Sequence, residues 1–114
     1  MSADYVPDVG DIVWLTLDPS KGHEQTGRRP ALVLTPKGYN ARTSLAVCCA
    51  VTNVSKGYPF EVPVNPAAGV TGVVLVDQIK SLDWVRRNAA RVGEADAPTL
   101  NNVRAVLETL LAMP

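Results

Sequence analysis

The chain has 114 residues, the size of one ordinary domain, so we expect a single domain over residues 1–114. Hydrophobic residues make up 46% and charged residues 19%, the formal net charge is zero, and no apolar run approaches the roughly 18 residues of a membrane span. These numbers argue against a disordered chain and a helical membrane protein. With no secretion signal at the N-terminus, they favour a cytoplasmic location.

Charge is unevenly distributed along the sequence. Residues 21–91 hold ten Lys and Arg against four Asp and Glu, whereas residues 1–20 and 92–114 are net acidic. A local basic surface supports the binding of a polyanion through counterion release, even in a neutral chain. A solvated surface of mixed charge explains the same counts equally well.

Three runs of β-branched and other apolar residues predict strands in the first half of the chain. Residues 11–17 end at Asp18-Pro19, and residues 30–35 end at Pro36. Residues 45–51 are almost continuously apolar, which predicts a strand buried on both faces.

The two cysteines, Cys48 and Cys49, are adjacent in this third predicted strand. Neighbouring residues of a strand point to opposite faces, which is poor geometry for a disulfide, so we expect packed and reduced thiols. Two cysteines and the lone His23 also fall short of a structural zinc set. Neither a metal nor another cofactor is expected.

Further strands are predicted in the second half. Residues 60–64 alternate between apolar and polar side chains, and Pro63 places this strand at a sheet edge. Residues 72–76 predict another buried strand, and residues 79–85 a short additional one.

A helix is predicted after Asp96, because Pro98 suits a first helical turn. Apolar residues then recur at helical spacing and form one stripe: Leu100, Val103, Leu107, Leu110 and Leu111. Short strands followed by one helix predict a mainly β fold. The expected architecture is a small antiparallel barrel with a C-terminal helix packed on it.

The segment from Gly22 to Pro30 places a histidine, a carboxylate and two guanidinium groups between two predicted strands. RNA can be cut without a metal when its own 2′-hydroxyl attacks the adjacent phosphate, provided that protons are moved and the added negative charge is stabilised. Arg29 suits phosphate binding, His23 suits proton transfer, and a partly buried Glu24 suits the role of base. A surface loop with one arginine paired to Glu24 is the structural alternative.

Other polar groups follow predicted strands. Thr52 comes directly after the buried third strand and could donate to a phosphate oxygen, although β-propensity alone makes threonine common there. Residues 55–60 combine Lys56 with two aromatic rings, as in an RNA-tracking turn or an ordinary anchored loop. Asp77 and Gln78 end another buried strand, where they could cap the backbone or face the same cleft.

Several motifs, taken in order, resemble the MazF/PemK (Kid) toxins of bacterial toxin–antitoxin pairs. These motifs are Tyr5-Val6-Pro7-Asp8, Gly10-Asp11-Ile12-Val13-Trp14, Asp18-Pro19, Gly22-His23-Glu24-Gln25, Arg29-Pro30-Ala31-Leu32-Val33-Leu34, Ser55-Lys56-Gly57-Tyr58-Pro59-Phe60-Glu61-Val62 and Gly72-Val73-Val74-Leu75-Val76-Asp77-Gln78. The resemblance extends to about Gly93.

This resemblance implies a homodimeric, SH3-like or CcdB-like barrel that cuts single-stranded RNA, usually mRNA, at a short sequence. It implies cleavage without a metal, leaving a 2′,3′-cyclic phosphate and a 5′-hydroxyl. It also implies a cognate antitoxin that lays an acidic, partly disordered segment over the RNA site, which fits the basic middle of this chain.

The resemblance also implies roles for individual residues. MazF-like members place catalysis at the positions of Arg29 and Thr52, with that of Glu24 assisting. Kid-like members use those of His23 and Asp77 together with an arginine two residues before the aspartate; because that position is Leu75 here, Arg29 and Thr52 rank first. Five residues are expected to contact RNA: Gln25, Arg28, Lys56, Gln78 and Lys80.

Two alternatives stand beside this hypothesis. A CcdB-like toxin of the same fold binds gyrase without cutting RNA, but such toxins end in a Trp-Gly-Ile type motif, whereas this chain ends Leu110-Leu111-Ala112-Met113-Pro114. An inactive binding module would keep the barrel and the dimer, and the presence of Arg29 together with Thr52 argues against it.

Overall fold

The computed structural model describes residues 5–17 and 27–114. The described strands are β1 (Asp11–Leu17), β2 (Gly27–Val33), β3 (Leu45–Thr52), β4 (Glu61–Pro63), β5 (Val73–Leu75), β6 (Lys80–Asp83) and β7 (Ala90–Glu94). The helices are α1 (Lys37–Thr43) and α2 (Ala97–Ala112), with 3-10 turns at Pro66–Ala68 and Val76–Gln78.

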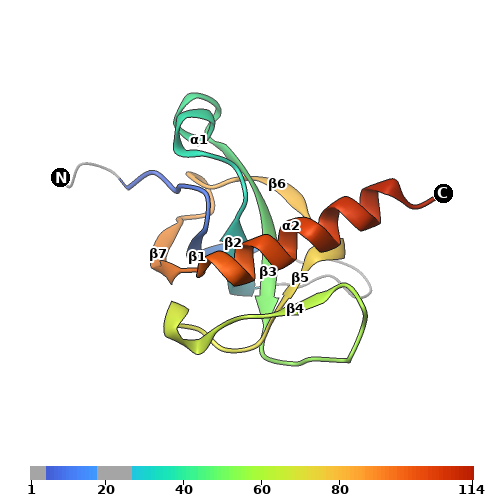
Figure 1. The fold of residues 1–114 in the computed structure, drawn as a ribbon. Coiled ribbons are helices and arrows are strands. Elements are labelled where there is room, and N and C mark those ends of the chain that lie inside the picture. The colour runs from blue at the N-terminus through green and yellow to red at the C-terminus, as the bar shows by residue number, and fades with distance from the viewer. Residues whose placement is uncertain (1–4, 18–26) are drawn as a thin grey trace.

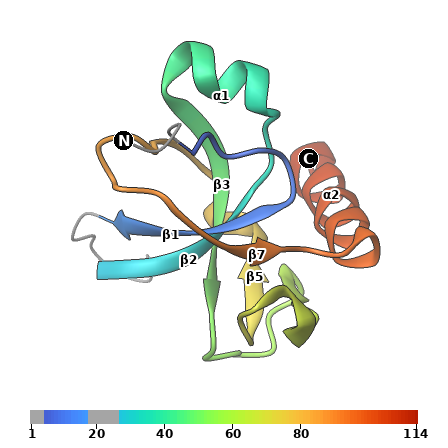
Figure 2. The same ribbon diagram turned by 90° about the vertical axis from the view of Figure 1, so that its left-hand side faces the viewer.

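All strand pairs are antiparallel, and the strands follow the order β4-β5-β3-β2-β1-β7, with β6 paired to β3 (Figure 1). Figure 2 shows β1, β2 and β7 running across the direction of β3 and β5, so the sheet is strongly curved. This arrangement, with α2 packed on it, confirms the mainly β, barrel-type fold with a terminal helix.

Strand β3 lies at the centre of this sheet. It pairs with β2 along one side, and on the other side first with β6 and then, at Val51 and Thr52, with β5. Cys48 packs in a cluster with Val13 and Leu15, while Cys49 packs in a second cluster, which includes residues of α2. The predictions of a strand buried on both faces, with oppositely directed cysteines, are therefore confirmed.

Both cysteines are free thiols within the sheet. Burial raises the pKa of Cys48 and of Cys49 to about 12, so both stay protonated at neutral pH. Because the thiolate is the reactive form, these residues act as packing groups.

The edge strands of the sheet agree in part with those predicted from the sequence. Strand β4 is outermost, with Pro63 opposite Val73, which confirms the predicted edge position. At the other edge, β7 pairs with β1 and was not predicted. The sequence of β7 includes the charged residues Arg91 and Glu94 and lacks the clear alternation of apolar and polar residues that normally indicates a strand. Strand β7 is stabilised by its pairing with β1.

Helix α2 begins as predicted. The Asp96 carboxylate accepts the Thr99 amide at 2.9 Å and the Asn65 side-chain amide at 2.9 Å, and Pro98 lies in the first turn. Val103 is fully buried against the sheet, but Leu111 is 74% exposed. Leu111, the last residue of the predicted apolar stripe, is therefore not covered, because the last turns of α2 run past the sheet (Figure 1). Among the described residues, no helix is long and apolar enough to cross a membrane.

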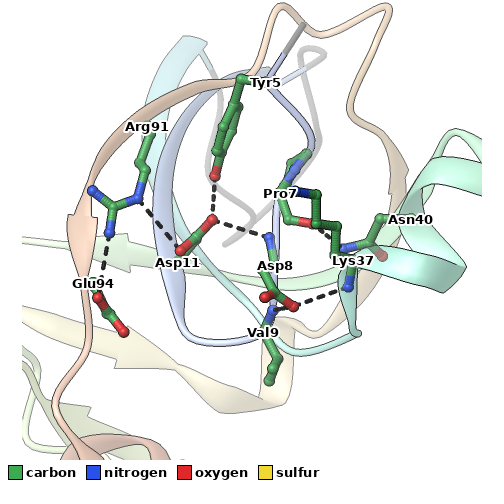
Figure 3. Close-up of polar contacts among 9 residues, drawn as sticks. All are labelled: Tyr5, Pro7, Asp8, Val9, Asp11, Lys37, Asn40, Arg91 and Glu94. Atoms are coloured by element: carbon green, nitrogen blue, oxygen red, sulfur yellow. Dashed lines mark hydrogen bonds and ion pairs between the residues drawn. The ribbon is translucent and has the colours of Figure 1, made fainter. Parts of the chain in front are cut away.

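The segment before β1 is fixed to the sheet by the buried Asp11 (Figure 3). One Asp11 oxygen accepts the Tyr5 hydroxyl and the Asp8 amide, and the other lies 3.5 Å from Nε of Arg91. Burial first, and then the hydrogen bond to Asp11, raise the pKa of Tyr5, so its hydroxyl remains a donor. The N-terminal segment and β7 are thus joined through one carboxylate on β1.

Helix α1 is a second element that the sequence did not predict, and its buried Asn40 explains why it forms. The Asn40 side-chain amide donates to the carbonyl of Pro7 at 2.8 Å and of Thr35 at 2.9 Å, and its oxygen accepts the Thr35 hydroxyl at 2.7 Å. Its backbone carbonyl accepts the Trp84 indole N–H at 3.0 Å. These tertiary bonds outweigh the weak helix propensity of residues 37–43.

We predict that Asn40→Ala lowers the free energy of unfolding by about 3 kcal/mol, because it leaves buried backbone and hydroxyl groups without partners. The matched control is Asn101→Ala on the exposed face of α2, which should change stability by less than about 0.5 kcal/mol. Urea unfolding measures both. Equal midpoints for the two variants would contradict the account of α1.

Candidate functional site

The ends of β2 and β3 bring Arg29 and Thr52 together. Ala31 lies opposite Ala50 in the register of these strands. This pair ends the recorded register of β2 and β3, and Arg29 and Thr52 each lie two residues beyond it, at the same end of the two strands. The two residues ranked first for catalysis therefore lie at the same end of this part of the sheet.

Arg29 and Thr52 both line an open pocket of about 450 Å³. The pocket wall combines apolar and polar residues, the others being Trp14, Pro30, Val51, Asn53, Pro66, Gly69, Val70 and Thr71. A nucleotide needs both kinds of surface, since its base stacks on apolar groups and its phosphate binds a cation. The pocket can therefore accommodate a phosphate of a single strand beside Arg29.

Thr52 is held rigidly at the end of β3, with only 7% of its surface exposed. Its hydroxyl oxygen accepts the Val54 amide at 3.2 Å, which leaves the hydroxyl hydrogen to be donated outward. Gly72 permits this packing: a Cβ there would come within 2.0 Å of the Thr52 carbonyl oxygen, and its φ of +119° suits glycine.

A second hollow of about 150 Å³ adjoins Thr52 and is lined by three more of the predicted site residues. Lys56, Asp77 and Gln78 line it, together with Val54, Tyr58, Glu61 and Leu75. Asp77 is exposed in the 3-10 turn that follows β5. Lys80 comes just after this turn, on β6 opposite Cys48.

The turn that carries Lys56 is fixed by the carboxylate of Glu61. One Glu61 oxygen accepts the Ser55 hydroxyl at 2.7 Å and the Gly57 amide at 3.1 Å, and the other accepts the Lys56 amide at 3.0 Å. The bond from Ser55, followed by those from the backbone amides, lowers the pKa of Glu61. Lys56 is thus presented from an ordered turn at the rim of the hollow.

Arg28 points away from Arg29, because consecutive residues of β2 face opposite sides. Its guanidinium donates to the Thr16 hydroxyl at 3.0 Å, to the Arg87 carbonyl at 3.3 Å and to the Asn88 carbonyl at 2.7 Å. These bonds join the start of β2 to β1 and to the chain before β7.

The sequence analysis assigned no role at the site to Trp14. Trp14 is 39% exposed and lines the Arg29 pocket, although it lies in a strand whose neighbouring residues are fully buried. In the sequence Trp14 stands between the apolar residues Val13 and Leu15, so nothing there distinguishes it from a core residue. The predicted residues His23, Glu24 and Gln25 lie outside the described residues.

Within residues 5–17 and 27–114, no three His, Cys, Asp or Glu side chains are clustered in a way that could hold a metal ion.

Comparison with known proteins gives consistent matches over almost the whole chain. Residues 8–111 match the family described as the PemK-like, MazF-like toxin of type II toxin–antitoxin systems. The Escherichia coli K12 protein named endoribonuclease toxin MazF is 43% identical over 111 residues, which cover 97% of this chain and 99% of that protein.

Two solved structures from Deinococcus radiodurans are similar in both sequence and fold. A crystal structure of MazF has a TM-score of 0.90 at 55% identity and covers 96% of this chain and 100% of its own. A MazE-MazF crystal structure has a TM-score of 0.85 at 50% identity and covers 97% and 100% respectively.

We predict that the turn carrying Lys56 stays ordered as the pH falls through 4.5, the ordinary pKa of a glutamate carboxyl. Because folding lowers the pKa of Glu61, its stabilising contribution is present above the ordinary value and is lost only as the pH falls through the lowered one. The amide NMR shifts of Lys56 and Gly57 report this transition, and Glu61→Gln should abolish it. A midpoint at or above the ordinary value would contradict the hydrogen-bonding account.

Proposed function

The chain belongs to the PemK-like, MazF-like toxin family of type II toxin–antitoxin systems, and we propose that it cuts single-stranded RNA, in particular mRNA, at a specific sequence. The observation that carries this proposal is the pocket shared by Arg29 and Thr52. The E. coli relative is named an endoribonuclease, which favours RNA cleavage over the gyrase-binding and inactive alternatives.

In the proposed reaction, the 2′-oxygen of a ribose forms a bond to the adjacent phosphorus and the bond to the 5′-oxygen breaks. The 2′-hydroxyl proton passes to a base, and the leaving 5′-oxygen receives a proton. The products are a 2′,3′-cyclic phosphate and a 5′-hydroxyl. Arg29 would neutralise the negative charge that develops on the phosphate oxygens, so the scheme needs no metal ion.

Thr52 would donate its hydroxyl hydrogen to a phosphate oxygen, because its own oxygen already accepts the Val54 amide. Proton transfer is assigned to His23 and Glu24, with Asp77 as the supporting candidate from the adjoining hollow. These roles match the chemistry of the groups. An arginine stays protonated, so it is better suited to binding phosphate oxygens than to transferring a proton.

Binding of the neighbouring nucleotides is assigned to residues around the pocket. Trp14 offers a ring on which a base can stack, and Lys56 offers a cation on an ordered turn. Gln78 adds a hydrogen-bonding amide beside Lys56, and Lys80 and Gln25 complete the proposed RNA contacts. Arg28, bonded to backbone carbonyls, would contribute positive charge while holding the start of β2.

We further propose a homodimer, and a cognate antitoxin as the partner. The D. radiodurans relative was crystallised as a MazE-MazF pair, which supports an antitoxin for this chain as well. An acidic, partly disordered segment would compete with RNA for the basic residues at the site. The proposed activity belongs in the cytoplasm, where mRNA is translated.

We predict that the purified protein cuts a long single-stranded RNA at discrete sites in EDTA and leaves cyclic phosphate ends. Arg29→Ala should remain folded but lose at least about 100-fold in cleavage rate, because a preorganised charge at the phosphate is removed. Arg104→Ala, an exposed arginine on α2, is the charge-matched control and should retain the wild-type rate. End-group analysis and mapping of the cuts provide the measurement.

Two outcomes would overturn parts of this proposal. If RNA stayed intact at a high concentration of the wild-type protein, the proposed endoribonuclease activity would be contradicted. Equal rates for Arg29→Ala and Arg104→Ala would remove Arg29 from the mechanism.

We predict a smaller effect at Thr52. Thr52→Val keeps the shape but loses the hydroxyl, and should slow cleavage about tenfold, equivalent to one hydrogen bond of about 1.4 kcal/mol. Thr52→Ser restores the hydroxyl and should recover most of that loss. Single-turnover rates at saturating enzyme distinguish the two variants, and equal rates for Val and Ser would show that the hydroxyl takes no part.

A further inference from the structure

The guanidinium group of Arg28 donates hydrogen bonds to three other residues. Its Nη1 donates to the Thr16 hydroxyl at 3.0 Å and to the Arg87 carbonyl at 3.3 Å. Its Nη2 donates to the Asn88 carbonyl at 2.7 Å. Thr16 lies near the end of β1, and the two carbonyls belong to the turn at residues 84–88, between β6 and β7. We call these three bonds the Arg28 network.

Backbone bonds of the same residues reinforce the Arg28 network. The Thr16 amide donates to the Arg87 carbonyl at 3.0 Å, so this carbonyl accepts from both Thr16 and Arg28. Nη1 of Arg87 donates in turn to the Thr16 carbonyl at 2.9 Å. Asn88 has a φ of +54°, a left-handed conformation that residues other than glycine seldom adopt. The end of β1, the start of β2 and the turn at residues 84–88 therefore hold one another in place.

The backbone that this network fixes is the one that carries Arg29. In the register of β1 and β2, Thr16 lies opposite Arg28 and Leu15 lies opposite Arg29. Leu15 is fully buried, whereas Arg29 lines the pocket together with Thr52. A charge stabilises a transition state only when it is held in place beforehand, and a shift of about 1 Å can cost roughly 100-fold in rate. The position of the start of β2 therefore bears directly on the proposed chemistry.

The bonds of Arg28 do not suit a direct contact with RNA. Arg28 lines neither the Arg29 pocket nor the adjoining hollow. Both of its terminal nitrogens are bonded to protein acceptors, although bidentate phosphate binding normally uses such a pair of donors. A planar guanidinium can hold three acceptors through two nitrogens, whereas a lysine presents a single one. The shape of Arg28, in addition to its charge, is therefore used by the fold.

We propose that Arg28 is a positioning residue for catalysis, which acts through the backbone of β2 to place Arg29 at the scissile phosphate. This inference rests on the proposed function and extends it. It gives Arg28 a different role from the RNA contact expected from the sequence. Under this role the geometry of Arg28 matters for the chemical step, and its charge is not sufficient.

The experiment compares Arg28→Lys, which keeps the charge and loses the planar group, with Arg28→Gln, which loses both. Arg104→Lys makes the same change at an exposed arginine of α2 and is the matched control. Single-turnover cleavage of a single-stranded RNA that contains the mapped cut sequence gives the rate of the chemical step. Fluorescence anisotropy gives Kd over a range of salt concentrations, and urea unfolding shows that each variant is folded.

Arg28→Lys should cleave about tenfold more slowly than wild type, because Arg29 is no longer held at the phosphate. Its Kd, and the slope of log Kd against log salt, should match wild type. Arg28→Gln should cleave no faster than Arg28→Lys. When Arg28→Lys is added to Arg29→Ala, little further rate should be lost, since the residue acts through Arg29. Arg104→Lys should match wild type in every assay.

A second variant reaches the same network from β1. Thr16→Val removes the hydroxyl that accepts from Arg28, while the backbone bonds of this exposed strand residue remain. It should slow cleavage by a smaller factor, about threefold, because Arg28 keeps its two carbonyl acceptors. Combined with Arg28→Lys it should lose less than the product of the two single losses.

Two results would overturn the proposal. A wild-type rate for Arg28→Lys, with a slope of log Kd against log salt lowered by about 0.7 in Arg28→Gln, would assign Arg28 to a direct phosphate contact. A loss that multiplies in full with that of Arg29→Ala would show that Arg28 acts without Arg29.

Failure of the proposed function would be distinguishable, because wild-type protein would then leave the RNA intact. The positioning role can still be read in the free protein by NMR. Arg28→Lys should speed hydrogen exchange of the Thr16 amide and shift the Nε–H signal of Arg29, whereas Arg104→Lys should change neither. If both signals of Arg28→Lys matched wild type, Arg28 would not position Arg29.

Discussion

The pairing of β3 on both sides is the constraint on which the rest of the structure depends. Strands β5 and β6 pair with one side of β3, and β2 pairs with the other. Cys48 and Cys49 pack on opposite faces of β3, in separate hydrophobic clusters. Slipping this register by one residue would turn every side chain to the wrong face. The pairing of β2 with β3 brings the ends that carry Arg29 and Thr52 to one pocket, so the packing that stabilises the fold also positions the site.

Sequence patterns were informative wherever local chemistry decides the structure. The bounds of β1 agree with the predicted residues 11–17 because Gly10 and Asp18-Pro19 flank a strongly β-prone run. Tertiary contacts decide the elements that were missed: Asn40 holds α1, and β7 forms because β1 offers an open edge. Helical spacing likewise could not show that the sheet ends before Leu111.

The candidate site was predictable from the sequence only with the help of the family resemblance. Spacing alone gave Thr52 no more weight than any strand-end threonine, and nothing in the sequence paired it with Arg29. The structure supplies that pairing, adds Trp14 to the pocket and separates Arg28 from Arg29. Arg28 and Arg29 are adjacent in the sequence but differ in their surroundings: Arg29 lines the pocket, whereas the Arg28 guanidinium donates to the Thr16 hydroxyl and to backbone carbonyls.

The central claim is that Arg29 and Thr52 act on one phosphate, and a double-mutant cycle tests it most directly. Single-turnover cleavage rates are measured for wild type, Arg29→Ala, Thr52→Val and the double variant. Groups that hold the same phosphate are coupled, so the double variant should lose clearly less than the product of the two single losses. Losses that multiply in full would show that the two residues act independently, and would contradict a shared phosphate.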